Sequence, residues 1–129
     1  MPMIKIDVIE GRTDEQIQTL LDTAHRAMVD AFEVPEDDRY QILNEHPASR
    51  MIIKDTGLGF SRSRNVVVVS VTSRPRTEAS KVRFYQLLAE GLKTHCDIES
   101  NDLMVSIVIN SDEDWSFGFG RAQFLTGEL

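Results

Sequence analysis

The sequence predicts an α/β fold of the α+β sandwich type, in which two βαβ units in tandem build a four-stranded mixed sheet with two helices on one face. A strand pattern, a helix pattern and a second strand pattern recur in that order in both halves of the chain. Thr13 and Thr77, each expected to begin a helix, are 64 positions apart, and so are Asp38 and Asp102. We expect right-handed crossovers, because parallel strands are almost always connected in that sense.

The length of 129 residues fits one domain, which we expect to span residues 1–129. The two units are predicted at about residues 2–45 and 65–110. The tail at 111–129 is polar and contains glycines and aromatic residues, which indicates irregular or short-stranded structure.

The first unit begins with alternating apolar and polar residues at 2–8, a strand pattern. Residues 13–16, Thr-Asp-Glu-Gln, form a capping box that opens a helix. Pro35 ends this helix, and residues 40–43 predict a second strand. The apolar face of the helix is formed at helical spacing by Ile17, Leu20, Leu21, Ala24, Met28 and Ala31.

The second unit repeats this plan. Residues 66–71 predict a strand, and Thr77 caps a helix that carries Val82, Tyr85, Leu88 and Leu92. Leu103–Ile109 is the last predicted strand, and Gly57-Leu58-Gly59, between the units, predicts a turn.

The chain has a net charge of −7, which disfavours nucleic acid and anionic membranes as partners.

The single cysteine, Cys96, excludes an internal disulfide, and the first residues do not resemble a signal peptide, so a cytoplasmic protein is expected. His25, His46 and His95 lack metal-ligand spacing, and no nucleotide, flavin or haem motif is present. We therefore expect no metal and no cofactor.

Residues 66–69 are four consecutive valines, apolar at both alternating positions, as in a strand buried on both faces. Two helices cover one face of the sheet only. Other copies of the chain are the natural cover for the second face, so a closed homo-oligomer is expected.

Pro2 is the first candidate for chemistry, because Met1 is normally removed before proline. Removal leaves a secondary amine at the start of a strand, where it can act as an acid, a base or a nucleophile. With Met1 attached, the same nitrogen is an amide and is neither basic nor nucleophilic.

Arg74-Pro75-Arg76 lies between a strand's carboxyl end and a helix start, where α/β proteins commonly bind ligands. Two guanidinium groups there can hold a carboxylate in a fixed geometry. A solvated basic loop is the alternative. Asp38, which is expected to open the strand stretch at 38–41, is a third candidate, because a carboxylate near an amine stabilises its protonated form. A surface turn residue in an acidic run is the alternative interpretation of Asp38.

The tail contains the aromatic residues Trp115, Phe117 and Phe119, with Phe124 beyond them. Aromatic side chains flanked by glycines can form the wall of a dry pocket, or pack against the body or another subunit.

Five stretches and the end of the tail, in this order and spacing, resemble the tautomerase superfamily, and within it the malonate semialdehyde decarboxylase family. They are residues 9–14, 38–41, 55–59, 73–76, 114–118 and 124–127. The resemblance covers nearly the whole chain, and it implies a βαβ repeat assembled as a homotrimer.

The resemblance also implies the roles of residues. Pro2 matches the catalytic amino-terminal proline, Asp38 the catalytic aspartate, and Arg74 and Arg76 the paired arginines of that family. Its apolar pocket wall is matched by Trp115, Phe117, Phe124 and Leu129. The implied activity is the cofactor-independent decarboxylation of a small 3-oxo acid, malonate semialdehyde, to acetaldehyde and carbon dioxide.

Two other activities are alternative interpretations of the same residues. A keto–enol tautomerase would use neutral Pro2 as a base, and a hydratase or dehalogenase of 3-haloacrylates would use its protonated form with a water-activating group. A non-catalytic trimer that binds a small ligand is a different class, since the fold alone does not specify chemistry.

Overall fold

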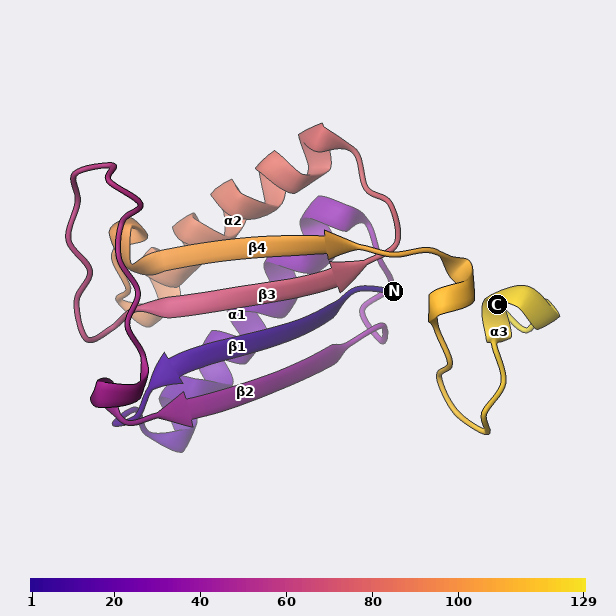
Figure 1. Ribbon diagram of the computed structural model, residues 1–129, viewed down its shortest axis with the longest axis horizontal. Helices are drawn as coiled ribbons and strands as arrows, with labels where there is room; N and C mark the ends of the chain where they lie inside the picture. Colours follow the sequence, from indigo (N-terminus) through magenta and orange to yellow (C-terminus); the bar gives the residue numbers. More distant parts are fainter.

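Two strand–helix–strand units follow one another in the computed structural model, which describes residues 1–129 (Figure 1). The first unit consists of β1 (Met3–Ile9), α1 (Asp14–Phe32) and β2 (Tyr40–His46). The second consists of β3 (Val67–Ser73), α2 (Glu78–Cys96) and β4 (Leu103–Ile109). Short helical turns η1 (Ala48–Arg50), η2 (Ser100–Asp102) and η3 (Asp112–Asp114), and a short helix α3 (Gln123–Thr126), lie between and after them.

The four strands form one mixed sheet in the order β2-β1-β3-β4. Each unit contributes a parallel pair, β1 with β2 and β3 with β4, and the units join through antiparallel pairing of β1 with β3. Met3 pairs with Thr72 and Val8 with Val67, so the two units meet symmetrically at the centre of the sheet. The predicted tandem repeat and mixed sheet are confirmed.

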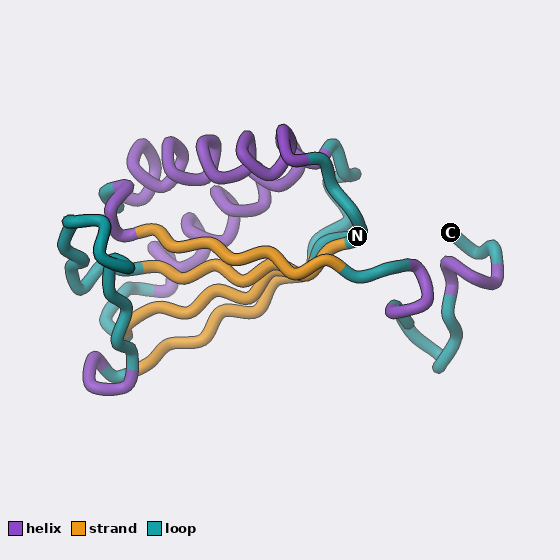
Figure 2. Tube along the Cα trace, turned by 45° about the horizontal axis from the view of Figure 1, so that its top comes forward, coloured by secondary structure: helices purple, strands orange, loops and turns teal.

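Both long helices lie on the same face of the sheet (Figure 2). Their boundaries follow from matched caps: Thr13 forms a capping box with Gln16, and the Thr77 side chain accepts a hydrogen bond from the Ser80 N–H. Each helix ends at a left-handed residue, Glu33 with φ 54° and Asp97 with φ 55°. The first helix thus stops at Phe32, before the predicted breaker Pro35.

The core fills the space between the helices and the sheet. Ile6 and Val8 of β1 and Phe84 and Leu88 of α2 are fully buried in it. Each such side chain contributes roughly 1.5–3 kcal/mol relative to exposure. The core therefore fixes the sheet on the helices, and both ends of the strands are held in defined positions.

The opposite face of the sheet has no helix over it (Figure 2). Ile42 of β2 and Val108 of β4 point to this face and are 49% and 63% exposed. Val68, on the same face of β3, is half-buried. The valine strand is therefore buried on one face within a single chain, and its second face is available for another copy.

Two predicted boundaries are wrong. The strand expected at 66–71 runs from Val67 to Ser73, because pairing with β4 continues to Ile109. Asp38 does not open a strand: its N–H donates to the Pro35 carbonyl (3.0 Å) in a turn, and β2 begins at Tyr40. An alternating pattern does not distinguish the first strand residue from the turn before it.

The tail after β4 extends beyond the sheet beside the amino terminus (Figure 1). It contains η3, an isolated bridge between Gly118 and Arg121, and α3, so it is mainly irregular and helical. The predicted turn at 57–59 is present: the Asp55 carboxylate accepts hydrogen bonds from the Gly57 and Gly59 N–H groups. No helix combines the length and apolar character needed to cross a membrane.

Candidate active site

The chain's amino group and the Asp38 carboxylate face each other at one end of the sheet. The Met1 nitrogen is 3.8 Å from Asp38 Oδ2. Asp38 is 7% exposed, and neither of its carboxylate oxygens has a hydrogen-bond partner. A buried carboxylate without donors is costly, and its presence favours a cation beside it. The Met1 ammonium marks the place near which a Pro2 amine would lie after removal of Met1.

The pKa of this amino group is lowered from its ordinary value, first of all by burial. The charge of Asp38 acts in the opposite sense and raises the pKa, whereas the charges of Arg76 and Arg74 lower it further. An acid and two cations therefore act on the amine together, and the balance between its charged and neutral forms is set by residues from both units.

Arg76 is held by groups on two elements. Its Nε donates to Ser73 Oγ (3.1 Å) and its NH1 to the Phe32 carbonyl (3.2 Å), while the guanidinium lies 5.1 Å from the Phe32 ring centre. Burial, and then the charge of Arg74, lower the pKa of Arg76. No carboxylate pairs with Arg76 within 4.0 Å, so its guanidinium keeps donors for a ligand.

Two residues of the tail hold the Arg74 side chain in place. Its NH1 donates to Asp112 Oδ1 (3.0 Å), and its guanidinium stacks 3.9 Å from the centre of the Phe124 ring. Its buried Nε has no hydrogen-bond partner. Arg74 therefore has both a held orientation and an unused donor.

The predicted aromatic wall forms a continuous cluster. The Trp115 and Phe117 rings are stacked at 5.4 Å, and Phe117 meets Phe124 edge-on, also at 5.4 Å. Tyr40 of β2 lies 5.8 Å from Phe117, which ties the tail to the body. Leu129, predicted as part of this wall, is 58% exposed, and its N–H donates to the Gln123 carbonyl (3.3 Å).

The structure thus brings Asp38, Arg74 and Arg76 to the end of the sheet where the chain begins, as the turns after β3 and before β2 require (Figure 1). Sequence reasoning missed the residues that hold the arginines: Ser73, Asp112 and the Phe32 carbonyl. Ser73 adjoins the arginine segment, but nothing in the sequence indicates which residue its hydroxyl contacts. No group of three or more His, Cys, Asp or Glu side chains is placed to hold a metal ion.

Comparison with known proteins identifies the family of this chain. Two models, both described as tautomerase enzyme, match residues 38–118 and residues 2–61. This chain belongs to the tautomerase family. A probable tautomerase of Bacillus subtilis (strain 168), YrdN, is 58% identical over 129 residues, which is 100% of both chains.

Solved structures of tautomerase-superfamily proteins resemble this chain closely. A malonate semialdehyde decarboxylase, described with decarboxylase and hydratase activities, is 55% identical with a TM-score of 0.95 over 98% of both chains. FG41 malonate semialdehyde decarboxylase, inhibited by 3-bromopropiolate, is 40% identical with a TM-score of 0.94 over 98% of this chain and 97% of the other. A fused 4-OT described as an asymmetric trimer is 26% identical, with a TM-score of 0.75 over 96% and 98% of the chains. The trimeric relative supports a homo-oligomer for this tautomerase-family chain.

Proposed function

We propose that this enzyme, once Met1 has been removed, decarboxylates malonate semialdehyde or a closely related small 3-oxo acid. The observation that carries the proposal is the placement of a buried carboxylate without hydrogen bonds, Asp38, 3.8 Å from the chain's amino group, with the influence of Arg74 and Arg76 on that amine. The 55% identity to a malonate semialdehyde decarboxylase supports the choice of substrate.

The reaction needs charge stabilisation at one oxygen. Breaking the bond between the carboxylate carbon and C2 releases carbon dioxide and leaves the electron pair on the enolate oxygen of the former aldehyde. Protonation at C2 then gives acetaldehyde. Pro2, protonated and neighboured by Asp38, would donate a hydrogen bond to that oxygen as its charge grows, an interaction worth a factor of about 10²–10³ in rate.

The two arginines would hold the substrate carboxylate. Arg76 keeps free donors, and Arg74 has an unused Nε–H. A carboxylate held by both can be oriented so that its breaking bond is perpendicular to the carbonyl plane, which lets the electron pair pass into the carbonyl. Fixed orientation of this kind is a major source of rate enhancement.

The wall formed by Trp115, Phe117 and Phe124 would exclude water from the reacting end of the substrate, and Leu129 is proposed to complete it. Neutral carbon dioxide is favoured over a carboxylate in such surroundings. A covalent route, in which neutral Pro2 forms an iminium that takes up the electron pair, uses the same residues.

Hydration of a small acetylenic or halogenated acid is a second candidate activity, because the 55% identical relative is described as both a decarboxylase and a hydratase. It would use the same ammonium and arginines, with a water molecule attacking the substrate. Keto–enol tautomerisation needs the neutral amine, whereas hydration and decarboxylation through a hydrogen bond from Pro2 use the protonated one. The pKa of the Pro2 amine therefore decides which of these activities is available at a given pH.

The test is acetaldehyde release from malonate semialdehyde by protein whose mass confirms the loss of Met1. We expect rapid turnover, a fall of at least about 10²-fold for Pro2→Ala, and no turnover for protein that retains Met1. Arg50→Ala, an exposed arginine in η1, is the matched control and should keep full activity. Full activity of Pro2→Ala would contradict the mechanism.

We also propose that the protein is a homotrimer, with the helix-free face of the sheet covered by the other subunits. Ile42 and Val108 on that face are exposed in the single chain. The trimeric description of the fused 4-OT relative supports this number of subunits.

A further inference from the structure

The repeat places a counterpart of Arg76 at the other end of the molecule, whereas the position equivalent to Arg74 is occupied there by Glu10. A shift of 64 positions carries β3 onto β1 and α2 onto α1, and it relates Arg76 to Arg12 and Pro2 to Val66. Arg12 lies directly before the helix cap Thr13, as Arg76 lies directly before Thr77. Arg64 joins it from the segment that leads into β3.

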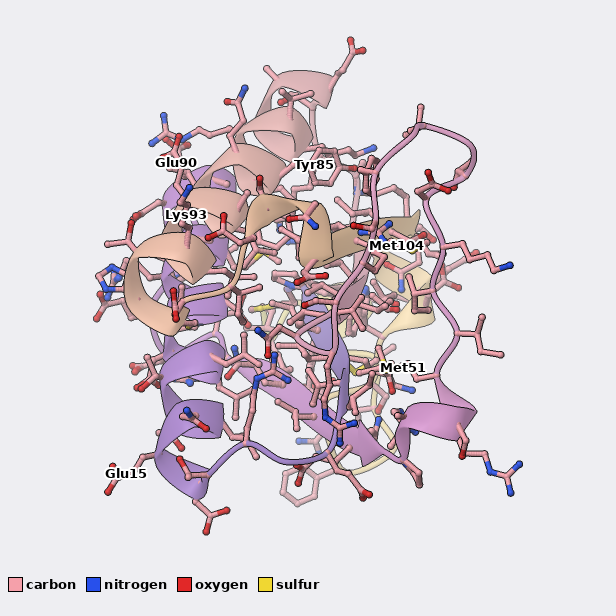
Figure 3. The ribbon with its side chains drawn as sticks, turned by 90° about the vertical axis from the view of Figure 1, so that its left-hand side faces the viewer. Glu15, Met51, Tyr85, Glu90, Lys93 and Met104 are labelled. Carbon is pink, nitrogen blue, oxygen red and sulfur yellow. The ribbon has the colours of Figure 1, made fainter.

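These arginines border a cavity of about 800 Å³. It lies between the end of β1, the start of α1 and the end of α2, at the end of the molecule that faces the viewer in Figure 3, where Glu15 is labelled. Gly11, Thr13 and Cys96 contribute to its wall. It is thus separate from the candidate active site, at the opposite end of the strands.

Arg12 is available to a ligand. Its NH2 donates to the Asn65 carbonyl (2.9 Å), Arg64 NH2 donates to the Glu10 carbonyl (3.3 Å), and no carboxylate pairs with either arginine within 4.0 Å. Arg12 and Arg76 are also alike in that burial lowers the pKa of both. A half-buried guanidinium with free N–H groups, at a helix start, suits a carboxylate.

The groups that would perform chemistry are absent at this end. Val66 stands where the first unit has Pro2, and its nitrogen is a peptide N–H that donates to the Ser63 carbonyl (3.2 Å). The Asp102 carboxylate, the counterpart of Asp38, accepts from the Ser63 N–H (2.6 Å) and hydroxyl (2.5 Å). The counterparts of Pro2 and Asp38 are thus both engaged, one as a peptide N–H and the other as a hydrogen-bonded carboxylate.

We propose that this cavity binds a small monocarboxylate on Arg12 and Arg64 without converting it. Glu10, Glu15 and Asp97 also border the cavity, are exposed, and form no ion pair with these arginines. Their charges disfavour ligands with several negative groups. A short aliphatic monocarboxylate has one negative group for the arginines to bind and no second one for these carboxylates to repel.

The test is a titration with sodium propionate, followed by the backbone amide signals in NMR. It uses the full chain carrying Arg74→Ala and Arg76→Ala, so that the candidate active site does not contribute. We expect saturable shifts at Gly11, Arg12 and Thr13, and none with propionamide, which has similar shape and no charge. Adding Arg12→Ala should weaken binding at least tenfold, whereas adding Arg50→Ala should leave it unchanged.

Three results would overturn the proposal: no saturable shift at these amides, equal binding in the Arg12→Ala protein, or equal shifts with propionamide. If Arg12→Ala does not fold, Arg12→Lys keeps the charge and removes the planar pair of donors, and it should still weaken binding several-fold. Arg64→Ala, a substitution at an exposed position, should likewise weaken binding several-fold. Because the readout is binding, the result does not depend on the proposed decarboxylation.

Discussion

Asp38 and Asp102 occupy equivalent turns of the two units but have opposite hydrogen bonding. Each donates its N–H to the carbonyl three residues earlier, that of Pro35 or Glu99, at 3.0 Å. Asp102 then accepts two hydrogen bonds from Ser63, whereas neither Asp38 oxygen accepts one, and Asp38 Oδ2 lies 3.8 Å from the amino group instead. The same backbone turn therefore carries a structural carboxylate in one unit and an unsatisfied one in the other.

This contrast predicts different outcomes for the same substitution. Asp102→Asn weakens two hydrogen bonds at a buried site and should lower the free energy of unfolding by about 1–3 kcal/mol, with little change in kcat. Asp38→Asn removes an unsatisfied buried charge, so stability should be equal or higher, while decarboxylation falls at least about 10²-fold. Thermal unfolding and acetaldehyde release measured on both variants separate the roles. Equal loss of stability in both would contradict the assignment.

The amine pKa should respond to its neighbours with opposite signs. Asp38 raises the pKa of the amino group, and Arg76 and Arg74 lower it. In protein that begins at Pro2, Asp38→Asn should lower the amine pKa and Arg76→Ala should raise it. If protonated Pro2 is the active form, the rate falls as pH rises through this pKa, and the fall moves to lower pH in Asp38→Asn.

The measurement is a titration of ¹⁵N-labelled Pro2 by NMR, with the pH dependence of kcat recorded in parallel. Arg83→Ala on the exposed side of α2 is the control and should leave both curves in place. A rate that rises through the same pKa would indicate neutral Pro2, as expected for a base or an iminium former.

Ser73 should act as a positioning residue for Arg76. Its buried hydroxyl accepts from Arg76 Nε (3.1 Å) and donates to the Arg74 carbonyl (2.8 Å). A hydrogen bond to a charged group is worth about 1.5–3 kcal/mol, so Ser73→Ala should raise KM at least about tenfold and change kcat less. Steady-state kinetics check this, and Ser49→Ala, at an exposed position of η1 remote from the site, is the control. An unchanged KM would show that the Phe32 carbonyl holds Arg76 alone.

Much of the fold follows from local patterns. Thr13 and Thr77 cap the two helices as predicted, because a cap depends on residues close in sequence. The grouping of Asp38 with the arginines was implied by the family resemblance. The observed topology explains it, because the turn before β2 and the turn after β3 lie at the same end of the sheet.

The partners of the arginines could not be predicted. Asp112 binds Arg74 across 38 positions, and the Phe32 carbonyl binds Arg76 across 44. Such contacts depend on how the tail folds back and on where α1 ends, which one sequence does not specify. The second strand was expected to open at Asp38 but begins at Tyr40, because the Asp38 N–H donates to the Pro35 carbonyl in a turn that the sequence pattern does not reveal.

The helix-free face of the sheet should control assembly. Ile42 is 49% exposed there in the single chain, and its burial in a subunit contact would make a charge at this position costly. Ile42→Asp should therefore shift the protein from trimer to monomer, as measured by light scattering coupled to gel filtration. Val82→Asp is the matched control, because Val82 is exposed to a similar degree, 45%, but lies on α2, away from this face. A trimer that persists in Ile42→Asp but dissociates in Val82→Asp would place the subunit contact on the helices instead.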